Sequence, residues 1–147
     1  MSEFIVNVER RARLARWALV IAALAGMLAV MLGAFGAHGL RSSLSPKMMQ
    51  VYLTAVEYQF IHSLFLLAMG ALLASTCQLA WRWAVCAVYA ASFGLLVFCG
   101  SLYALVMSGV SALGMITPLG GLAFIVAWFS LALSVWLGRQ SDRNLSE

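Results

Sequence analysis

Seven polar or ionisable side chains lie in segments that are otherwise almost entirely apolar. They are His38, Glu57, Gln59, His62, Ser101, Tyr103 and Thr117, and we call them the polar cluster. Histidine changes charge near neutral pH, a carboxylate can pair with it, and hydroxyl and amide groups can donate or accept hydrogen bonds. These residue types could form a proton relay, or a hydrogen-bonded network that only fixes how helices pack. Which of these two uses is possible depends on where the predicted helices place the side chains.

The composition is that of an integral membrane protein. Of the 147 residues, 64% are hydrophobic and 10% are charged, and the mean hydropathy is +0.97. Soluble domains are about 45–50% apolar and about 25% charged. Nine Lys and Arg with five Asp and Glu could not cover the surface of a soluble fold. The composition therefore excludes a cytosolic enzyme, a disulfide scaffold and a disordered chain.

Four apolar stretches are long enough to cross a bilayer, which takes roughly 20 residues for about 30 Å of hydrocarbon. They cover about residues 17–40, 56–79, 83–107 and 116–137. The stretches are continuous rather than alternating, which predicts helices and not barrel strands. We therefore expect an all-α, polytopic four-helix transmembrane bundle over residues 17–138. A basic tail (1–16) would precede this single domain, and a second tail (139–147) would follow it.

The distribution of Lys and Arg predicts the orientation. Seven of them flank one side of the bundle: Arg10, Arg11, Arg13, Arg16, Arg82, Arg139 and Arg143. The first loop on the other side has only Arg41 and Lys47, and the positive-inside rule then puts both termini in the cytoplasm. The basic flanks are expected to meet anionic lipid headgroups. We expect no nucleic-acid partner, because no aromatic or glycine pattern interleaves the arginines.

This topology places the whole polar cluster in the outer half of the bundle. An ionisable group inside a membrane usually faces the bundle interior and has a partner. The expected partner of Glu57 is His38, because a short loop joins their helices, with Tyr103 as a second candidate. Gln59 and His62 are three residues apart and share a helix face, whereas Glu57 and His62 are not expected to touch.

Small residues are expected to bring the helices close together. Gly33 and Gly100 each lie in a ladder of small residues spaced four apart, which lets helix backbones approach. Such ladders serve packing within the bundle or against another chain. Two neighbouring glycines after Pro118 could instead make a hinge or admit a ligand. The expected packing glycines are Gly33, Gly36, Gly100, Gly120 and Gly121.

Four motifs at these positions resemble a known family. They are GAFGAHGL (Gly33–Leu40), EYQxxH (Glu57–His62), GSLY (Gly100–Tyr103) and TPLGGLAF (Thr117–Phe124). In this order and at these separations the chain resembles the YgdD-like inner-membrane family, a domain-of-unknown-function family with an animal mitochondrial branch. Cys99 and Ala127 depart from the family pattern of serine and glycine, both small-for-small changes. The resemblance implies a four-helix protein of the cell inner membrane and no established activity.

Three functions fit these observations. The first is an accessory component that packs with lipids, another membrane protein or a second copy of itself. The second is a small transporter or proton relay that uses Glu57, His38 and His62. The third is a haem or metal site on the two histidines, which their different depths in the membrane disfavour. We expect no cofactor, no metal site and no catalytic residues, because no phosphate-binding loop, HExxH motif or Ser/His/Asp order is present.

Overall fold

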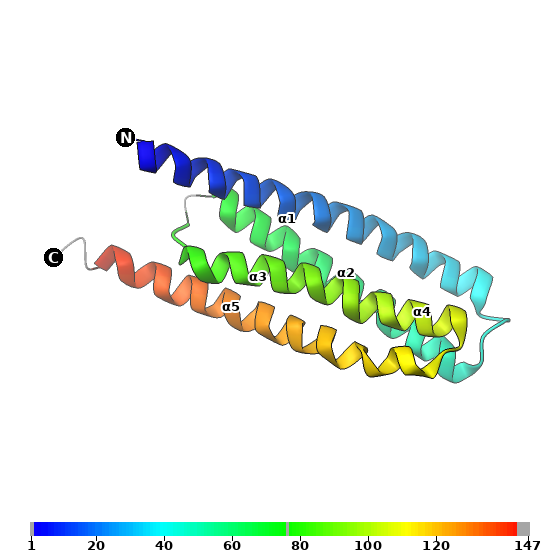
Figure 1. Ribbon diagram of the computed structural model, residues 1–147. Helices are drawn as coiled ribbons and strands as arrows, with labels where there is room; N and C mark the ends of the chain where they lie inside the picture. Colours follow the sequence, from blue (N-terminus) through cyan, green and yellow to red (C-terminus); the bar gives the residue numbers. More distant parts are fainter. Residues whose placement is uncertain (1, 76, 144–147) are drawn as a thin grey trace.

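The protein is a bundle of four long antiparallel helical rods (Figure 1). The computed structural model describes residues 2–75 and 77–143, with side chains for residues 6–75 and 77–138. Within this part of the chain, four rods are long and apolar enough to cross a membrane. The N- and C-terminal ends of the described chain lie at one end of the bundle (Figure 1). We call this end proximal and the opposite end distal.

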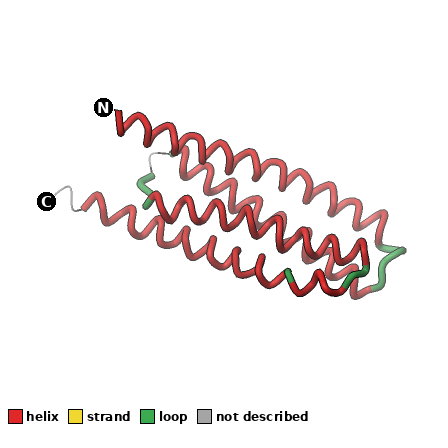
Figure 2. Tube along the Cα trace, viewed as in Figure 1, coloured by secondary structure: helices red, strands yellow, loops and turns green. Residues whose placement is uncertain are grey.

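Three of the four rods combine more than one kind of helix. The first is α1 followed by a π-helical turn, η1, and the third is α3 and α4 joined by a second π-helical turn, η2. The fourth begins with a short 3-10 helix, η3, and continues as α5. The connections between rods lie at the two ends of the bundle (Figure 2). The elements are α1 (Ser2–Phe35), η1 (Gly36–Leu40), α2 (Pro46–Ala74), α3 (Trp81–Gly94), η2 (Leu95–Cys99), α4 (Gly100–Ser108), the short 3-10 helix η3 (Ser111–Met115) and α5 (Thr117–Arg143).

The second rod differs most from the sequence prediction. Its apolar stretch begins near residue 56, but its helix begins at Pro46, where the sequence Ser45-Pro46 is typical of a helix start and the Ser45 hydroxyl accepts a hydrogen bond from the Met48 amide at 3.3 Å. Proline at the first helical position needs no amide partner, so the polar first turns are helical although they are not apolar. The helix ends at Ala74, five residues before the predicted 79. The residues between Ala74 and position 79 are mixed in polarity, so hydropathy alone does not place this boundary precisely.

Arg11 binds the end of α2. Its Nε donates to the Leu73 carbonyl at 2.8 Å, and its Nη2 donates to the carbonyls of Leu72 at 3.3 Å, Ser75 at 3.1 Å and Cys77. The last carbonyls of a helix lack partners within the helix and form the negative end of its dipole, so a guanidinium there is favourable. The predicted N-terminal tail is thus helical from residue 2 onward, and one of its arginines holds two rods together.

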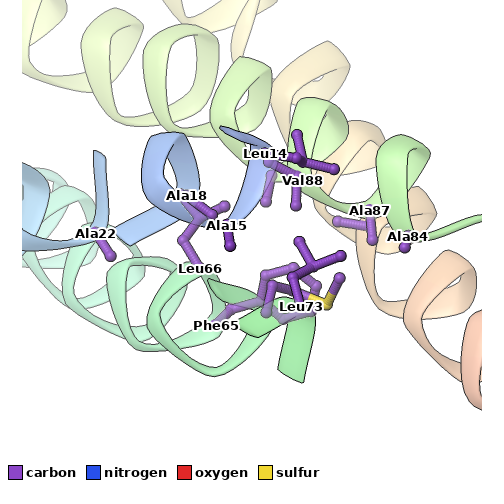
Figure 3. Close-up of a cluster of buried hydrophobic side chains, with 13 residues drawn as sticks. Leu14, Ala15, Ala18, Ala22, Phe65, Leu66, Leu73, Ala84, Ala87 and Val88 are labelled. Carbon is purple, nitrogen blue, oxygen red and sulfur yellow. The ribbon is translucent and has the colours of Figure 1, made fainter. Parts of the chain in front are cut away.

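An apolar core fills the proximal half of the bundle (Figure 3). Ala15, Ala18 and Ala22 on α1 are buried with Leu66 and Met69 on α2. Because the α1 side chains are small, the two helix backbones can pack closely. The same pattern recurs between the alanines of α3 and Ala127 on α5. Packing in the proximal half depends on the close fit of small apolar side chains, whereas most of the polar contacts between rods lie in the distal half.

We predict that Arg11→Gln lowers the free energy of unfolding by about 2 kcal/mol, because a charged donor to several carbonyls is lost. Thermal unfolding in lipid nanodiscs, followed by circular dichroism, measures this. Arg82→Gln removes the same charge from an exposed side chain and should leave the melting temperature almost unchanged. Equal melting temperatures for the two variants would contradict the capping role.

Candidate functional site

Gln59 connects three rods in the middle of the bundle. Its Nε2 donates to the Ala25 carbonyl of α1 at 2.9 Å, and its Oε1 accepts from the Tyr103 hydroxyl of α4 at 2.9 Å. Gln59 itself lies on α2 and is buried. In hydrocarbon no water can replace a missing partner, so polar groups must be paired within the protein. The Tyr103–Gln59–Ala25 contact therefore fixes the relative positions of α1, α2 and α4.

Tyr52 makes a second contact between rods near the distal end. Its hydroxyl donates to the Leu32 carbonyl of α1 at 2.7 Å, and its ring meets the Tyr103 ring edge-on at a centroid distance of 5.5 Å. The ring lies against Gly36, where an added Cβ would overlap it. Glycine at position 36 is what allows the buried Tyr52 ring to reach α1.

Ser101 and Thr117 join the third rod to the fourth. Their hydroxyl oxygens lie 2.8 Å apart, and the Ser101 hydroxyl also lies 3.0 Å from the Phe98 carbonyl, to which it can donate. One helical turn further, Gly120 packs against the backbone of Phe98, where a Cβ would overlap main-chain atoms. This part of the polar cluster therefore seats the beginning of α5 against η2.

The structure does not bring Glu57 to its predicted partners. Glu57 and His38 are both exposed, and among the described residues they form no ion pair. The Tyr103 hydroxyl binds Gln59 instead. Two residues along a helix are roughly 200° apart, so Glu57 and Gln59 face opposite ways. The neutral amide takes the interior position because it can donate and accept at once, and the carboxylate faces outward.

His62 is buried and only half satisfied. Its Nδ1 lies 2.8 Å from the Tyr58 carbonyl, one turn earlier in α2. A carbonyl only accepts, so Nδ1 carries the proton and Nε2 of the neutral ring is left as an acceptor. Nε2 is buried without a partner among the described residues. The imidazole stacks on the Phe124 ring of α5, with centroids 3.4 Å apart and planes 14° apart.

A groove runs along α2 and α5 beside this imidazole. Its cavity volume is about 800 Å³, and Tyr58 and His62 line one side. Tyr58 stacks on Phe98 with a centroid distance of 4.7 Å, and the exposed Trp128 ring meets Phe65 edge-on at a centroid distance of 4.7 Å. The remaining lining residues are Pro118, Gly121, Leu122, Phe124, Ile125 and Phe129. The groove is thus mainly aromatic and aliphatic, with an imidazole in its wall.

The five predicted packing glycines do not behave alike. Gly36 and Gly120 stand where any Cβ would overlap a neighbour, as described above. Gly33 and Gly121 have neighbours only at ordinary contact distance from a Cβ, at 3.4 and 3.7 Å. Gly100 faces open space, so the close packing predicted for it is not formed within this chain. Among the five predicted glycines, close approach therefore occurs at Gly36 and Gly120, and it also occurs at Gly70 and Gly94, which were not predicted.

Residues 32–121, which include the whole polar cluster, match the DUF423 family, described as a protein of unknown function. The chain belongs to the DUF423 family. This confirms the predicted membership of a small membrane-protein family without a known activity, as the fold confirms the all-α, four-helix prediction.

Relatives of this DUF423 chain are themselves called membrane proteins. It is 42% identical over 116 residues to the UPF0382 membrane protein SERP0230 of Staphylococcus epidermidis, covering 79% of this chain and 92% of the relative. It is 38% identical over 122 residues to the UPF0382 membrane protein YwdK of Bacillus subtilis, covering 79% and 93%. No solved structure matches the chain. The protein is thus an integral membrane protein, and its activity has to be argued from its own geometry.

Sequence reasoning overlooked several residues that shape this site. Tyr52 and Phe98 were not singled out, although each contacts a glycine that was. Phe124 ends the TPLGGLAF motif and Trp128 lies in the middle of the fourth apolar stretch, but neither position indicates that the two rings line a groove beside His62. The glycines themselves were a signal, because a glycine in a membrane helix can indicate that a ring or a backbone packs against it, as Tyr52 does at Gly36 and Phe98 does at Gly120.

Two adjacent glycines give a matched test of this packing. We predict that Gly120→Ala lowers the free energy of unfolding by about 1–3 kcal/mol, because its methyl group must displace the Phe98 backbone. Gly121→Ala should fold like the wild type, since its Cβ would be 3.7 Å from the Phe98 ring. The measurement is thermal unfolding of both variants in the same nanodiscs. The packing argument fails if the two melting temperatures fall equally.

Proposed function

We propose that this protein is a non-catalytic accessory component of the cell inner membrane that binds another membrane-spanning polypeptide. The observation that carries the proposal is the outward-facing carboxyl group of Glu57 on α2. The partner would be recognised by a basic or amide side chain at the same depth. The distal part of the exposed α2 face would be its contact surface.

The depth of Glu57 makes its exposure unfavourable in lipid. It lies about 26 Å along the helix axis from Ala74, at the proximal end of α2, which is within roughly 30 Å of hydrocarbon. Its exposed neighbours on the same face are apolar: Leu53, Phe60, Ile61 and Leu64. A carboxyl group surrounded by acyl chains loses its hydrogen bonds with water, whereas a partner side chain would restore them. An apolar face with one carboxyl group therefore favours a protein neighbour over lipid.

The polar contacts inside the bundle favour this role over a proton relay. A relay would need connected groups between Glu57 and His62. The described contacts instead end on main-chain carbonyls, that of Ala25 for Gln59 and that of Tyr58 for His62. A carbonyl does not pass on a proton in the way that a hydroxyl or an imidazole does. The buried contacts are thus better suited to fixing the shape that presents the α2 face.

The proximal end supports an orientation with both termini in the cytoplasm. Arg10 and Arg13 line a cavity of about 330 Å³ together with Trp17, Trp81 and Tyr89. Basic side chains beside interfacial aromatics suit the anionic headgroups of the cytoplasmic leaflet. We infer that lipid headgroups bind here, while Glu57 faces the outer leaflet.

Site-specific photo-cross-linking in native membranes tests the proposal. A benzophenone amino acid at position 60 lies one turn from Glu57, and one at position 30 lies on the exposed face of α1. We predict one discrete protein adduct from position 60, none from position 30, and loss of the adduct in Glu57→Gln. That variant should fold normally, because Glu57 is exposed.

Each other outcome contradicts the proposal. An adduct that persists in Glu57→Gln would show that the carboxyl group does not recognise the partner. An adduct with the mass of two copies of this chain would show self-association instead. Only lipid adducts at position 60 would mean that this face meets the bilayer.

A further inference from the structure

A buried imidazole with a free acceptor is the most unusual polar group in the described part of the chain. His62 is 4% exposed, its Nδ1 is committed to the Tyr58 carbonyl, and its Nε2 has no partner there. A buried acceptor without a hydrogen bond costs roughly 1–3 kcal/mol. Tyr58 and Phe124 hold the ring, with stacked planes at centroid distances of 5.9 and 3.4 Å. The fold therefore maintains an acceptor that only a donor from outside the chain would satisfy.

The surroundings restrict what that donor can be. His62 lies about 18 Å along α2 from Ala74, in the middle of the hydrocarbon, where lipid headgroups do not reach. A metal ion needs several ligands, and the described residues contain no group of three or more His, Cys, Asp or Glu that could hold one. A water molecule needs two to four polar partners, which an aromatic and aliphatic lining does not supply. The donor has to belong to a molecule that dissolves in the membrane.

The groove itself indicates a flat ring. Five aromatic side chains contribute to its lining besides the imidazole: Tyr58, Phe98, Phe124, Trp128 and Phe129. Offset stacking and edge-on contacts with such side chains favour an aromatic guest over an acyl chain. A cavity volume of about 800 Å³ lies in the range of sites for small organic ligands. The exposed side chains of Leu122, Ile125 and Phe129 form the rim, so the groove opens toward the membrane.

We propose that this groove binds a membrane-soluble hydroquinone, a quinol, whose ring lies among the aromatic side chains and whose hydroxyl donates to Nε2 of His62. Because Nε2 is buried, binding requires side chains around the groove to move. The oxidised quinone has the same ring but no hydroxyl donor, so the site discriminates the reduced form by one hydrogen bond. The site lies on the groove side of α2 and does not depend on the partner of Glu57.

Nitrogen-15 NMR of the histidine side chains tests the inference in the full chain. The protein has two histidines, so selective labelling in phosphatidylcholine nanodiscs gives separate imidazole signals for His62 and the exposed His38. Before addition, His62 should show a protonated Nδ1 and a non-hydrogen-bonded Nε2. Duroquinol, kept reduced, should shift the Nε2 signal of His62 toward that of a hydrogen-bonded acceptor and leave His38 unchanged.

Two matched ligands and one variant separate the hydroxyl from the ring. Duroquinone and the dimethyl ether of duroquinol lack the donor and should bind roughly tenfold more weakly than duroquinol, the effect of one hydrogen bond. In His62→Phe, which retains a ring to stack on Phe124, all three affinities should become equal. Equal binding of the three compounds to the wild type would overturn the proposal, as would no shift of Nε2 with duroquinol or a protonated Nε2 before any addition.

Discussion

The absence of water from the bilayer core is the constraint on which this structure depends. Most polar groups within the described span find a partner in the chain, and the contact from Tyr103 through Gln59 to the Ala25 carbonyl is the clearest example, whereas Glu57 and Nε2 of His62 are exceptions. The Gln59 contact determines which faces of α1, α2 and α4 meet in the middle of the bundle. Tyr52 makes the same kind of contact nearer the distal end, where its hydroxyl donates to the Leu32 carbonyl of α1. The proximal half has an alanine-rich core instead, and Arg11 supplies its main polar contact.

Much of the fold can be predicted from the sequence because a helix that spans a membrane requires a long, continuous apolar stretch. Continuous apolar runs predicted four helices, and the structure has four such rods among its described residues. The limits of the second helix could not be read from hydropathy. Its first turns are polar yet capped by Ser45, and its end is bound by Arg11, which is 62 residues from Leu73 in the chain. A contact between such distant residues leaves no local signal. From the sequence alone, Arg11 indicates only the orientation of the chain in the membrane.

The candidate site was predicted less completely, for a physical reason. Sequence identifies which polar residues lie at a given depth, and five of the seven members of the polar cluster contribute to the contacts around Gln59, Ser101 and His62, whereas His38 and Glu57 do not. The side of a helix that faces inward depends on packing, and here Gln59 points inward while Glu57 points outward. The free Nε2 of His62 depends on a 2.8 Å contact with the preceding turn and on the Phe124 ring. The first depends on the positions of α1 and α4, and the second on that of α5, so neither could be derived before the helices were placed together.

The account rests on the claim that polar contacts hold the middle of the bundle, and a double-mutant cycle measures this directly. Gln59→Leu and Tyr103→Phe, alone and together, would be unfolded reversibly in mixed detergent micelles. Interhelical hydrogen bonds in membranes average about 0.6 kcal/mol and reach about 1.7 kcal/mol, so a coupling energy in this range is predicted. Gln59→Leu combined with Tyr89→Phe, at an exposed side chain, should show no coupling. A coupling near zero between Gln59 and Tyr103 would contradict the account.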